Sequence, residues 1–566
     1  MTDITRYTEQ LQEYTQQLTA PGAPFELTEH LSSGVPIRCY RNAPPTLREA
    51  ISQGRQYGEK TFVTYEDDRW SFDQFFAQVD AFAHFLHQDL AVERGHRVAI
   101  AMRNYPEWMA AFAAIVSIGA VAVPLNSWGS AEELEYALDD AGAKIVCCDE
   151  VRAGLLQPRL AAGTIHAVVA RATSLPADNC THWAQAIEGG RELPDVSLSP
   201  GDLAMIMYTS GTTGRPKGAA STHFAICQAL YNFEFMATVS AMLNPEAIGH
   251  MLNAGFDPST LLAVPLFHVS GCYSVFLLNL RGGRKTSIMY KWDVSDALRI
   301  IERERITTFT GVPTMTMAMM SSPEWDQYDH QSLFAIGAGG TASPPHLKDM
   351  IYGKLPHAYP GTGYGMTETN ATCCSFTGEA YKLCPTSSGN LSPIVEVKTV
   401  DTDGRDLAEG ATGEIYVRSP TNAQQYWNNA EASASTFIEG WVATGDVGYI
   451  DEHGFLFIVD RIKDMVIRGG ENIYPIEVEG ILLGHAAVAE AAVFGIPHDS
   501  WGEELVAVIH STDPTLSGDN LASWTKEHLA AFKVPSQWRL SREPLPKNAT
   551  GKVLKAQLRG QWLAEG

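Results

Sequence analysis

The sequence predicts an α/β fold: a large N-terminal domain of parallel α/β sheets plus a β-rich subdomain, followed by a small C-terminal α+β domain. Up to about residue 390, short apolar runs alternate with helical patterns. This alternation is typical of parallel sheets, because two parallel strands need a long crossover connection. Beyond that point the strands are short and divided by Gly and Asp turns, and roughly the last hundred residues mix both element types.

The elements follow in chain order from these patterns. Expected strands are short apolar runs, and expected helices carry apolar residues at helical spacing. In the α/β region we expect strands at 98–102, 120–123, 144–147, 261–264, 307–310 and 334–336, and a helix at 130–141. In the β-rich part we expect strands at 396–400, 413–417 and 454–458. In the C-terminal part we expect a helix at 475–483 and strands at 487–494 and 504–510.

The uncharged run from Met109 to Leu125 is long enough to consider as a membrane span. It falls just short of the usual length, however, and Gly119 and Pro124 interrupt it. We therefore expect a buried helix that leads into a buried strand at 120–124, and no membrane span.

The chain is strongly acidic. Its 566 residues include 41 Lys and Arg against 65 Asp and Glu, which gives a net charge of −24. Such a surface does not attract nucleic acid or anionic lipid. If the substrates are anions, a local arrangement of cations and backbone donors must therefore hold them.

Cysteine usage and the chain ends indicate a cytoplasmic protein. The nine cysteines include no C-x-x-C pair, which favours reduced thiols over disulfides or a zinc site. The N-terminal residues are polar and do not resemble a secretory signal, and the C-terminus carries no prenylation box or peroxisomal tripeptide.

The sharpest local signal is a glycine-rich loop, Tyr-Thr-Ser-Gly-Thr-Thr-Gly-Arg-Pro-Lys-Gly at 208–218, directly after an apolar strand at 203–207. Glycines let backbone N–H groups approach an anion, and the hydroxyl groups add donors, so the loop suits a polyphosphate. It is not a Walker A loop, since Lys217 lies between Pro216 and Gly218, and it lacks the Rossmann glycine spacing.

This loop and four further motifs, in this order, resemble the adenylate-forming superfamily of acyl- and aryl-CoA synthetases, peptide-synthetase adenylation domains and beetle luciferases. The further motifs are Gly-Tyr-Gly-Met-Thr-Glu-Thr at 363–369, Thr-Gly-Asp at 444–446, the run Asp-Arg-Ile-Lys-Asp-Met-Val-Ile-Arg-Gly-Gly-Glu-Asn at 460–472, which continues to Glu479, and Pro-Lys-Asn-Ala-Thr-Gly-Lys at 546–552. The resemblance covers roughly residues 50 to 560.

The resemblance implies a reaction in two steps with ATP, Mg²⁺ and coenzyme A. A carboxylate attacks the α-phosphorus of ATP, pyrophosphate leaves, and a thiol then displaces AMP from the acyl-adenylate. It also implies an ATP- and acyl-binding domain at 1–459 and a mobile C-terminal domain at 460–566, with a hinge at Asp460. In the family the small domain rotates after adenylation, withdraws its lysine and presents a face near Gly469, Gly470 and Glu471 to the CoA channel.

The resemblance also assigns the nucleotide site. Tyr364 offers a flat face to adenine, Thr367 a hydroxyl to the α-phosphate, and Glu368 an oxygen ligand to Mg²⁺. Asp446 can accept both ribose hydroxyls, and Lys552 is expected to align the substrate carboxylate with the α-phosphate. The expected catalytic residues are Lys552, Thr367, Glu368 and His268. The expected ATP- and AMP-binding residues are Thr209, Ser210, Gly211, Thr212, Thr213, Gly214, Lys217, Gly339, Gly340, Tyr364, Gly365, Met366, Asp446, Ile458 and Arg461.

The acyl pocket is expected around the segment 265–272, which resembles the family's entrance to the acid slot. His268 lies where many relatives place a His or an aromatic residue near the carboxylate, whereas amino-acid-activating relatives usually carry Asp there. The expected lining residues are His268, Cys272, Phe276, Val312, Gly339 and Gly363. Because they are apolar, small or weakly polar, we expect an apolar tail. The methionines at 315–320 are better explained as a helical core stripe.

The leading hypothesis is therefore an AMP-forming carboxylic acid–CoA ligase for a medium- or long-chain fatty acid, with an aryl or arylalkenoic acid second. A luciferase-like oxygenase and an enzyme that loads a carrier protein stay open as alternatives. A non-catalytic binding protein is disfavoured, because such a relative would be expected to lose Lys552, Glu368 or the phosphate loop. The partners expected are small molecules, without nucleic acid or a membrane span, and a homodimer is left open.

Overall fold

Two large sheets carry most of the chain in the computed structural model, which describes residues 3–32, 34–209, 215–340, 344, 346–371, 373–468, 471–548 and 551–565. Within this part of the chain the first sheet has eight strands in the order β21-β11-β10-β6-β5-β7-β8-β9. They are β5 (Arg97–Ala101), β6 (Val121–Pro124), β7 (Ile145–Asp149), β8 (His166–Ala170), β9 (Cys180–His182), β10 (Leu203–Thr209), β11 (Lys217–Thr222) and β21 (Gln425–Tyr426).

The second sheet is parallel in its middle and antiparallel at both ends. Its parallel part runs through β3, β13, β12, β14, β15 and β16, and from β17 onward the strands pair antiparallel. Its strands are β3 (Thr61–Tyr65), β4 (Asp68–Ser71), β12 (Ser259–Leu262), β13 (Lys285–Ile288), β14 (Thr308–Gly311), β15 (Ala335–Gly339), β16 (Tyr359–Tyr364), β17 (Cys374–Thr377), β18 (Gly389–Leu391), β19 (Glu396–Val400), β20 (Gly413–Arg418), β22 (Phe437–Ile438), β23 (Trp441–Ile450) and β24 (Phe455–Arg461). The predicted β-rich subdomain is thus continuous with this sheet.

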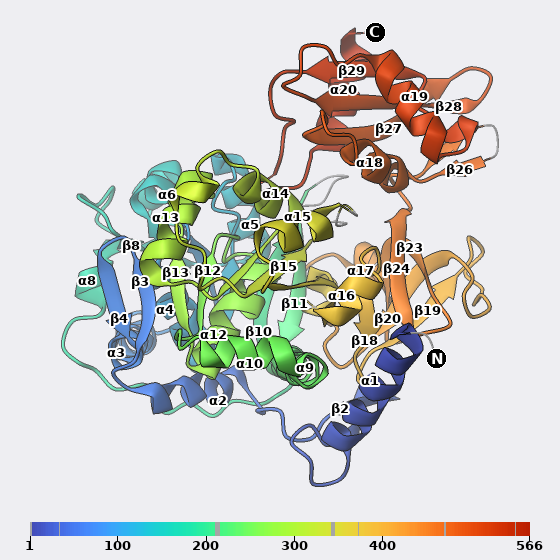
Figure 1. The fold of residues 1–566 in the computed structure, drawn as a ribbon. Helices are drawn as coiled ribbons and strands as arrows, with labels where there is room; N and C mark the ends of the chain where they lie inside the picture. The colour runs from blue at the N-terminus through green and yellow to red at the C-terminus, as the bar shows by residue number, and fades with distance from the viewer. Residues whose placement is uncertain are drawn as a thin grey trace.

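A third, smaller sheet follows β24 and lies above the two large sheets in Figure 1. It is built from β25 (Val466–Arg468), β26 (Glu471–Ile473), β27 (Glu490–His498), β28 (Gly502–His510) and β29 (Gln537–Ser541). The predicted α/β class, with parallel sheets first and a smaller α+β part last, is confirmed. At the opposite end of the molecule, β1 (Leu27–Ser32) pairs with β2 (Val35–Tyr40).

Helices cover the sheets. The longer ones are α1 (Asp3–Thr19), α3 (Phe72–His84), α4 (Pro106–Ser117), α5 (Ala131–Ala141), α9 (His223–Leu243), α10 (Pro245–Asn253), α13 (Val294–Glu304), α14 (Pro313–Met320), α15 (Leu347–Lys354), α18 (Pro475–Leu483), α19 (Gly518–His528) and α20 (Lys555–Glu565). The helix expected at 130–141 is α5. It begins after Ser130, whose hydroxyl accepts from the backbone N–H of Glu133 while the Glu133 side chain accepts from Ser130 N–H.

The uncharged run at 109–125 is part of the core. It forms α4, whose residues are all buried, and then β6, which is buried on both faces. An aromatic cluster around Trp108, Phe112 and Phe276 packs α4 against the neighbouring elements. Among the described residues, none of the helices combines the length and apolar character that a membrane crossing requires.

Candidate active site

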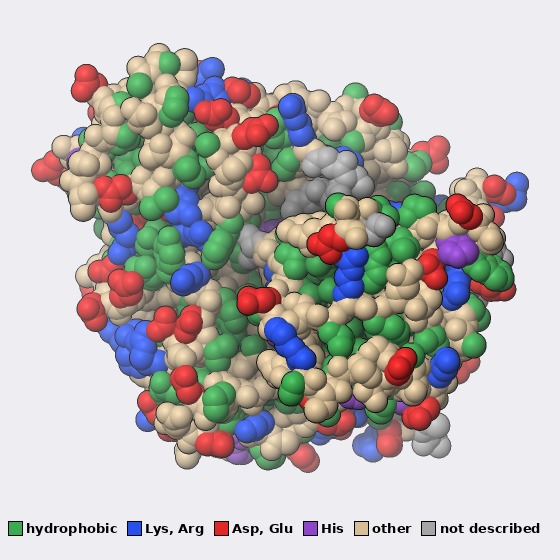
Figure 2. Space-filling view, turned by 90° about the horizontal axis from the view of Figure 1, so that it is seen from above, with side chains coloured by type: hydrophobic (Ala, Val, Ile, Leu, Met, Phe, Trp, Pro, Cys, Tyr) green, Lys and Arg blue, Asp and Glu red, His purple; other side chains and the backbone are tan. Residues whose placement is uncertain are grey.

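A cavity of about 1840 Å³ lies at the carboxyl ends of β14, β15 and β16 and continues between these strands and α9. Ligands of open parallel sheets bind at these strand ends. Figure 2 shows charged side chains of both signs scattered over the face seen from above, so the local groups described below must hold an anion.

Most of the predicted site residues converge on this cavity, although they come from segments that are far apart in the sequence. Those that line it are Thr209, Lys217, His268, Val312, Gly339, Gly340, Gly363, Tyr364, Gly365, Met366, Thr367, Glu368, Arg461 and Lys552. The predictions for Ser210, Gly211, Thr212, Thr213, Gly214, Gly469 and Gly470 lie outside the described residues.

A tyrosine–aspartate–arginine group with a buried aspartate forms one side of the site. Asp446 on β23 pairs in register with Arg461 on β24, and Arg461 Nε lies 2.9 Å from Asp446 Oδ1. The hydroxyl of Tyr364, at the end of β16, donates to Asp446 Oδ2 at 2.7 Å. Burial, followed by the charge of Asp446, raises the pKa of Tyr364 well above its usual value. Asp446 is only 2% exposed, so it lies behind the cavity wall that Tyr364 and Arg461 form.

Glu368 and Lys217 meet at a second tyrosine. Glu368, on the short turn Thr367–Thr369 after β16, is buried, and the hydroxyl of Tyr426 donates to its Oε1 at 2.6 Å. Burial raises the pKa of Glu368. Lys217 Nζ lies 5.0 Å from the centre of the Tyr426 ring. Sequence reasoning missed Tyr426, because a lone tyrosine far from any motif carries no signal.

Lys552 reaches the cavity from the C-terminal part of the chain. It follows Gly551, which has φ +82° in a hairpin closed by a bridge between Lys547 and Val553. A Cβ at Gly551 would lie 3.0 Å from Val312 Cγ2, so the hairpin packs directly on the large domain. Burial, and after it the charges of the nearby cations Arg461 and Lys463, lower the pKa of Lys552 to about 8. Lys463 also lines the cavity and was missed, although it lies within the 460–479 motif.

His268 marks the start of the acyl end. It caps the short helix α11 (Val269–Gly271), and burial lowers the pKa of its imidazole to about 4. The ring is therefore neutral at pH 7, and it offers a hydrogen bond rather than a positive charge.

Two predicted acyl-pocket residues lie in the core of this structure. Cys272 and Phe276 are fully buried and do not line the cavity. The segment is helical, through α11 and the π-helical turn η3 (Cys272–Leu277), so residues four apart share a face. The cavity face carries Ser270, Ser274 and Leu278, and the opposite face packs into the core.

Ile458 also lies away from the cavity. Its side chain packs against an apolar cluster beneath β24 and does not line the cavity, because alternate residues of a strand point to opposite faces. The expected core stripe of methionines is confirmed: Met315, Met319 and Met320 are buried in the core.

Asp460 and Glu471 lie outside the cavity. The buried carboxylate of Asp460 accepts from the N–H of Arg461 at 2.7 Å and from the N–H of Ile476, at the start of α18, at 3.1 Å. Asp460 therefore ties the end of β24 to the first helix of the C-terminal part. Glu471 is exposed at the start of β26.

Comparison with known proteins gives the family. The model of the AMP-binding enzyme family matches residues 51–427, and that of the AMP-binding enzyme C-terminal domain matches residues 477–552.

Relatives with different acid substrates match at similar identity. The long-chain-fatty-acid–CoA ligase FadD13 of Mycobacterium tuberculosis is 31% identical over 482 residues, which cover 84% of this chain and 90% of that protein. Feruloyl-CoA synthase of Amycolatopsis sp is 34% identical over 470 residues, with 83% and 89% covered.

Solved structures agree with these matches. The anthranilate CoA ligase AuaEII in complex with anthranoyl-AMP superposes with a TM-score of 0.80 at 26% identity, covering 94% of this chain and 99% of that chain. The o-succinylbenzoate CoA synthetase MenE of Bacillus subtilis with ATP and a magnesium ion gives a TM-score of 0.73 at 29% identity, with 91% and 99% covered. The chain therefore belongs to the AMP-binding enzyme family, in its acyl-CoA synthetase branch.

Proposed function

We propose that this AMP-forming acid–thiol ligase joins a medium- or long-chain fatty acid to coenzyme A through an acyl-adenylate. The observation that carries the choice of acid is the depth of the cavity. It follows β15 from Gly339 to Ala335, a distance of about 13 Å at the rise of a parallel strand. Val264, Val269 and Leu278 supply apolar surface along this branch, and such surface favours a hydrocarbon tail.

The cationic end of the cavity supports the adenylation step. Lys552, Arg461 and Lys463 line the same wall, next to Tyr364. Two anions, the acid and ATP, have to be brought together there, so a positive group between them offsets their repulsion and aligns the attack. Lys552 is best placed for this role, because its hairpin packs against Val312 beside the acyl branch.

Glu368 fits the magnesium ion that the reaction requires. Among the described residues no three His, Cys, Asp or Glu side chains form a metal cluster. A single buried carboxylate with one oxygen held by Tyr426 suits Mg²⁺, which commonly takes one or two protein ligands beside substrate phosphates. When bound, the ion neutralises phosphate charge, while Tyr426 keeps the carboxylate in place.

The thioester step requires a second arrangement of the small domain, under the same proposal. Residues 1–459 form the ATP- and acyl-binding domain, and residues 460–566 turn about Asp460 to bring Gly469, Gly470 and Glu471 to CoA. Lys552 lines the cavity in this structure, which supports assigning it to the adenylating arrangement. When the small domain turns, the hydrogen bond from Ile476 N–H to the Asp460 carboxylate either breaks or moves with the domain.

Release of AMP from ATP with a panel of linear and aromatic acids, with and without CoA, tests the proposal. We expect acid-dependent AMP and pyrophosphate, with acyl-CoA formed only when CoA is present, and the highest kcat/KM for linear acids of medium or long chain. ADP as the product would contradict adenylation. A clear preference for aromatic acids would replace the fatty acid by an aryl or arylalkenoic acid, the class of the feruloyl-CoA synthase relative.

A further inference from the structure

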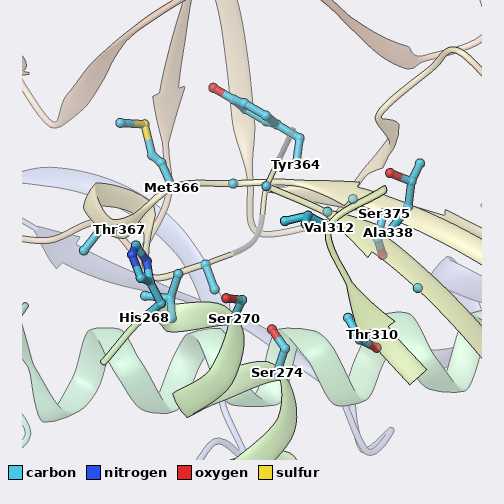
Figure 3. A pocket seen from close by; sticks show the side chains of 18 of the residues that line it. His268, Ser270, Ser274, Thr310, Val312, Ala338, Tyr364, Met366, Thr367 and Ser375 are labelled. Atoms are coloured by element: carbon cyan, nitrogen blue, oxygen red, sulfur yellow. The ribbon is translucent and has the colours of Figure 1, made fainter. Parts of the chain in front are cut away.

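Apolar surface alone would suit a plain alkyl chain. The middle of the acyl branch, however, carries hydroxyl groups. Ser270 on α11 and Ser274 on η3 line one wall, and Thr310 on β14 lines the sheet opposite. Figure 3 shows the two serines side by side on the helical turn, with Thr310 across from them on its strand. All three are half-buried.

The protein leaves these three hydroxyls unused. Among the residues that the structure describes, none of the three has a protein hydrogen-bond partner. Two other serines of the same cavity are paired: Ser240 is hydrogen-bonded to Thr377, and Ser375 donates to Met236 Sδ at 3.1 Å.

The strand register gives the depth of this polar band. Thr310 pairs with Gly337, two residues before Gly339 on β15. A Cβ at Gly337 would lie 2.9 Å from Thr310 Oγ1, so this oxygen lies over the glycine. Gly339 borders the cationic end, so the band lies about 7 Å deeper than the position of the reacting carboxylate. That depth corresponds to the middle of a medium-length acid.

A tail without polar atoms would bind poorly at this depth. It would displace water from the three hydroxyls and leave them without partners, and a site built with hydrogen-bonding groups discriminates strongly against a ligand that lacks them. A tail that carries its own donor or acceptor restores the bonds. Apolar side chains, among them Val269 and Leu278, also line the cavity.

We propose, on the basis of the acid–CoA ligase function above, that the preferred acid carries a hydrogen-bonding oxygen on its tail, a hydroxyl or oxo group on a chain or a phenolic hydroxyl on a ring. Ser270, Ser274 and Thr310 receive that oxygen. They set the selectivity for the tail and take no part in adenylation.

Matched pairs of acids test this inference on the full-length enzyme. One arm compares decanoic acid with a series of its monohydroxy and oxo isomers, in which the oxygen moves along the chain. A second arm compares cinnamic acid with its para-hydroxy derivative. We expect kcat/KM to be about tenfold higher for the oxygenated member of at least one pair, with an optimum at mid-chain in the linear series. The arm in which this occurs identifies the skeleton.

Variants tie the selectivity to the three residues. Thr310→Val keeps the shape and removes the hydroxyl, and Ser270→Ala and Ser274→Ala remove the other two. Each should reduce the preference for the oxygenated acid and raise kcat/KM for the plain one. Thr399→Val, a buried threonine on β19 away from the cavity, is the matched control and should change neither.

The outcomes separate this inference from the proposed function. If plain acids drive AMP and acyl-CoA formation and oxygenated acids are no better at any position, the ligase stands and the inference is overturned. A preference that survives all three substitutions also overturns it. If no acid drives AMP formation, the proposed function itself fails.

Discussion

The two ends of the cavity are built in different ways. At the nucleotide end the two carboxylates are held by specific polar partners: Asp446 by Arg461 and Tyr364, and Glu368 by Tyr426. At the acyl end the wall is the exposed face of a helix and of a strand, with hydroxyls that have no protein partner. We therefore expect the first end to be organised in advance for one ligand, and the selectivity of the second end to change with single side chains.

The largest effect is expected at the nucleotide end. Lys552→Ala should reduce acid-dependent ATP–pyrophosphate exchange about a thousandfold, because it removes the cation between two reacting anions. Thioester formation from a synthetic acyl-adenylate should be largely spared. Lys547→Ala is the control, since Lys547 lies on the same hairpin but is paired with Glu490. If the variant exchanged pyrophosphate at nearly the wild-type rate, Lys552 would have no role in the adenylation step.

Phe276→Ala tests the boundary between acyl wall and core. Because Phe276 is buried against Phe62, Phe75 and Phe112, truncation should destabilise the fold by about 3 kcal/mol or more and lower the melting temperature. The surviving folded protein should keep its ranking of acids. If the variant instead preferred longer acids and kept its melting temperature, Phe276 would be part of the acyl wall.

Gly339→Val should narrow the neck between the two ends. A Cβ at Gly339 has no atom nearer than Gly363 O at 3.9 Å, so the new side chain enters open space without straining the fold. We expect the KM for acids to rise about thirtyfold and the KM for ATP to change little. Gly353→Ala, on α15 in open space, is the control. Equal rises in both KM values would show that this position serves the nucleotide as well.

The pH profile of adenylation sharpens the assignment of Lys552. Its pKa of about 8 means that the ammonium loses its proton as the pH rises through that value. In the free enzyme kcat/KM for exchange should therefore fall above pH 8, to about a tenth one unit higher. Lys552→Arg should remove this decline, because arginine keeps its proton throughout the range. A decline that persists in the arginine variant would assign it to another group.

Tyr426→Phe should have the smallest effect. It removes the hydroxyl that holds Glu368 and should lower kcat about fivefold while raising the Mg²⁺ concentration needed for half-maximal rate. Tyr416→Phe, at a half-buried tyrosine on β20, is a suitable control. An unchanged Mg²⁺ requirement would mean that the hydrogen bond serves packing alone.

Particular residues show how far sequence reasoning reached. Tyr364, Thr367 and Glu368 were predicted together, because they follow a single strand as one contiguous motif, and the end of β16 brings all three to the cavity. Cys272 and Phe276 were misplaced, because the prediction considered the segment at 265–276 without the phase of its helix. Tyr426 is 58 residues from Glu368 in sequence, and no local pattern predicts the hydrogen bond between them.

The sequence by itself determined the chemistry expected of this protein. Its motifs predict that a phosphate-binding loop, a carboxylate and a lysine surround one nucleotide, and such local signals can be recognised without knowledge of the fold. Only the tertiary structure decided which side chains meet the acid. The acyl wall is composed of faces from α9, α11, η3 and β14–β17, and the face that each presents depends on helix phase and strand register. These are set when hydrophobic burial, a non-local interaction, selects one packing.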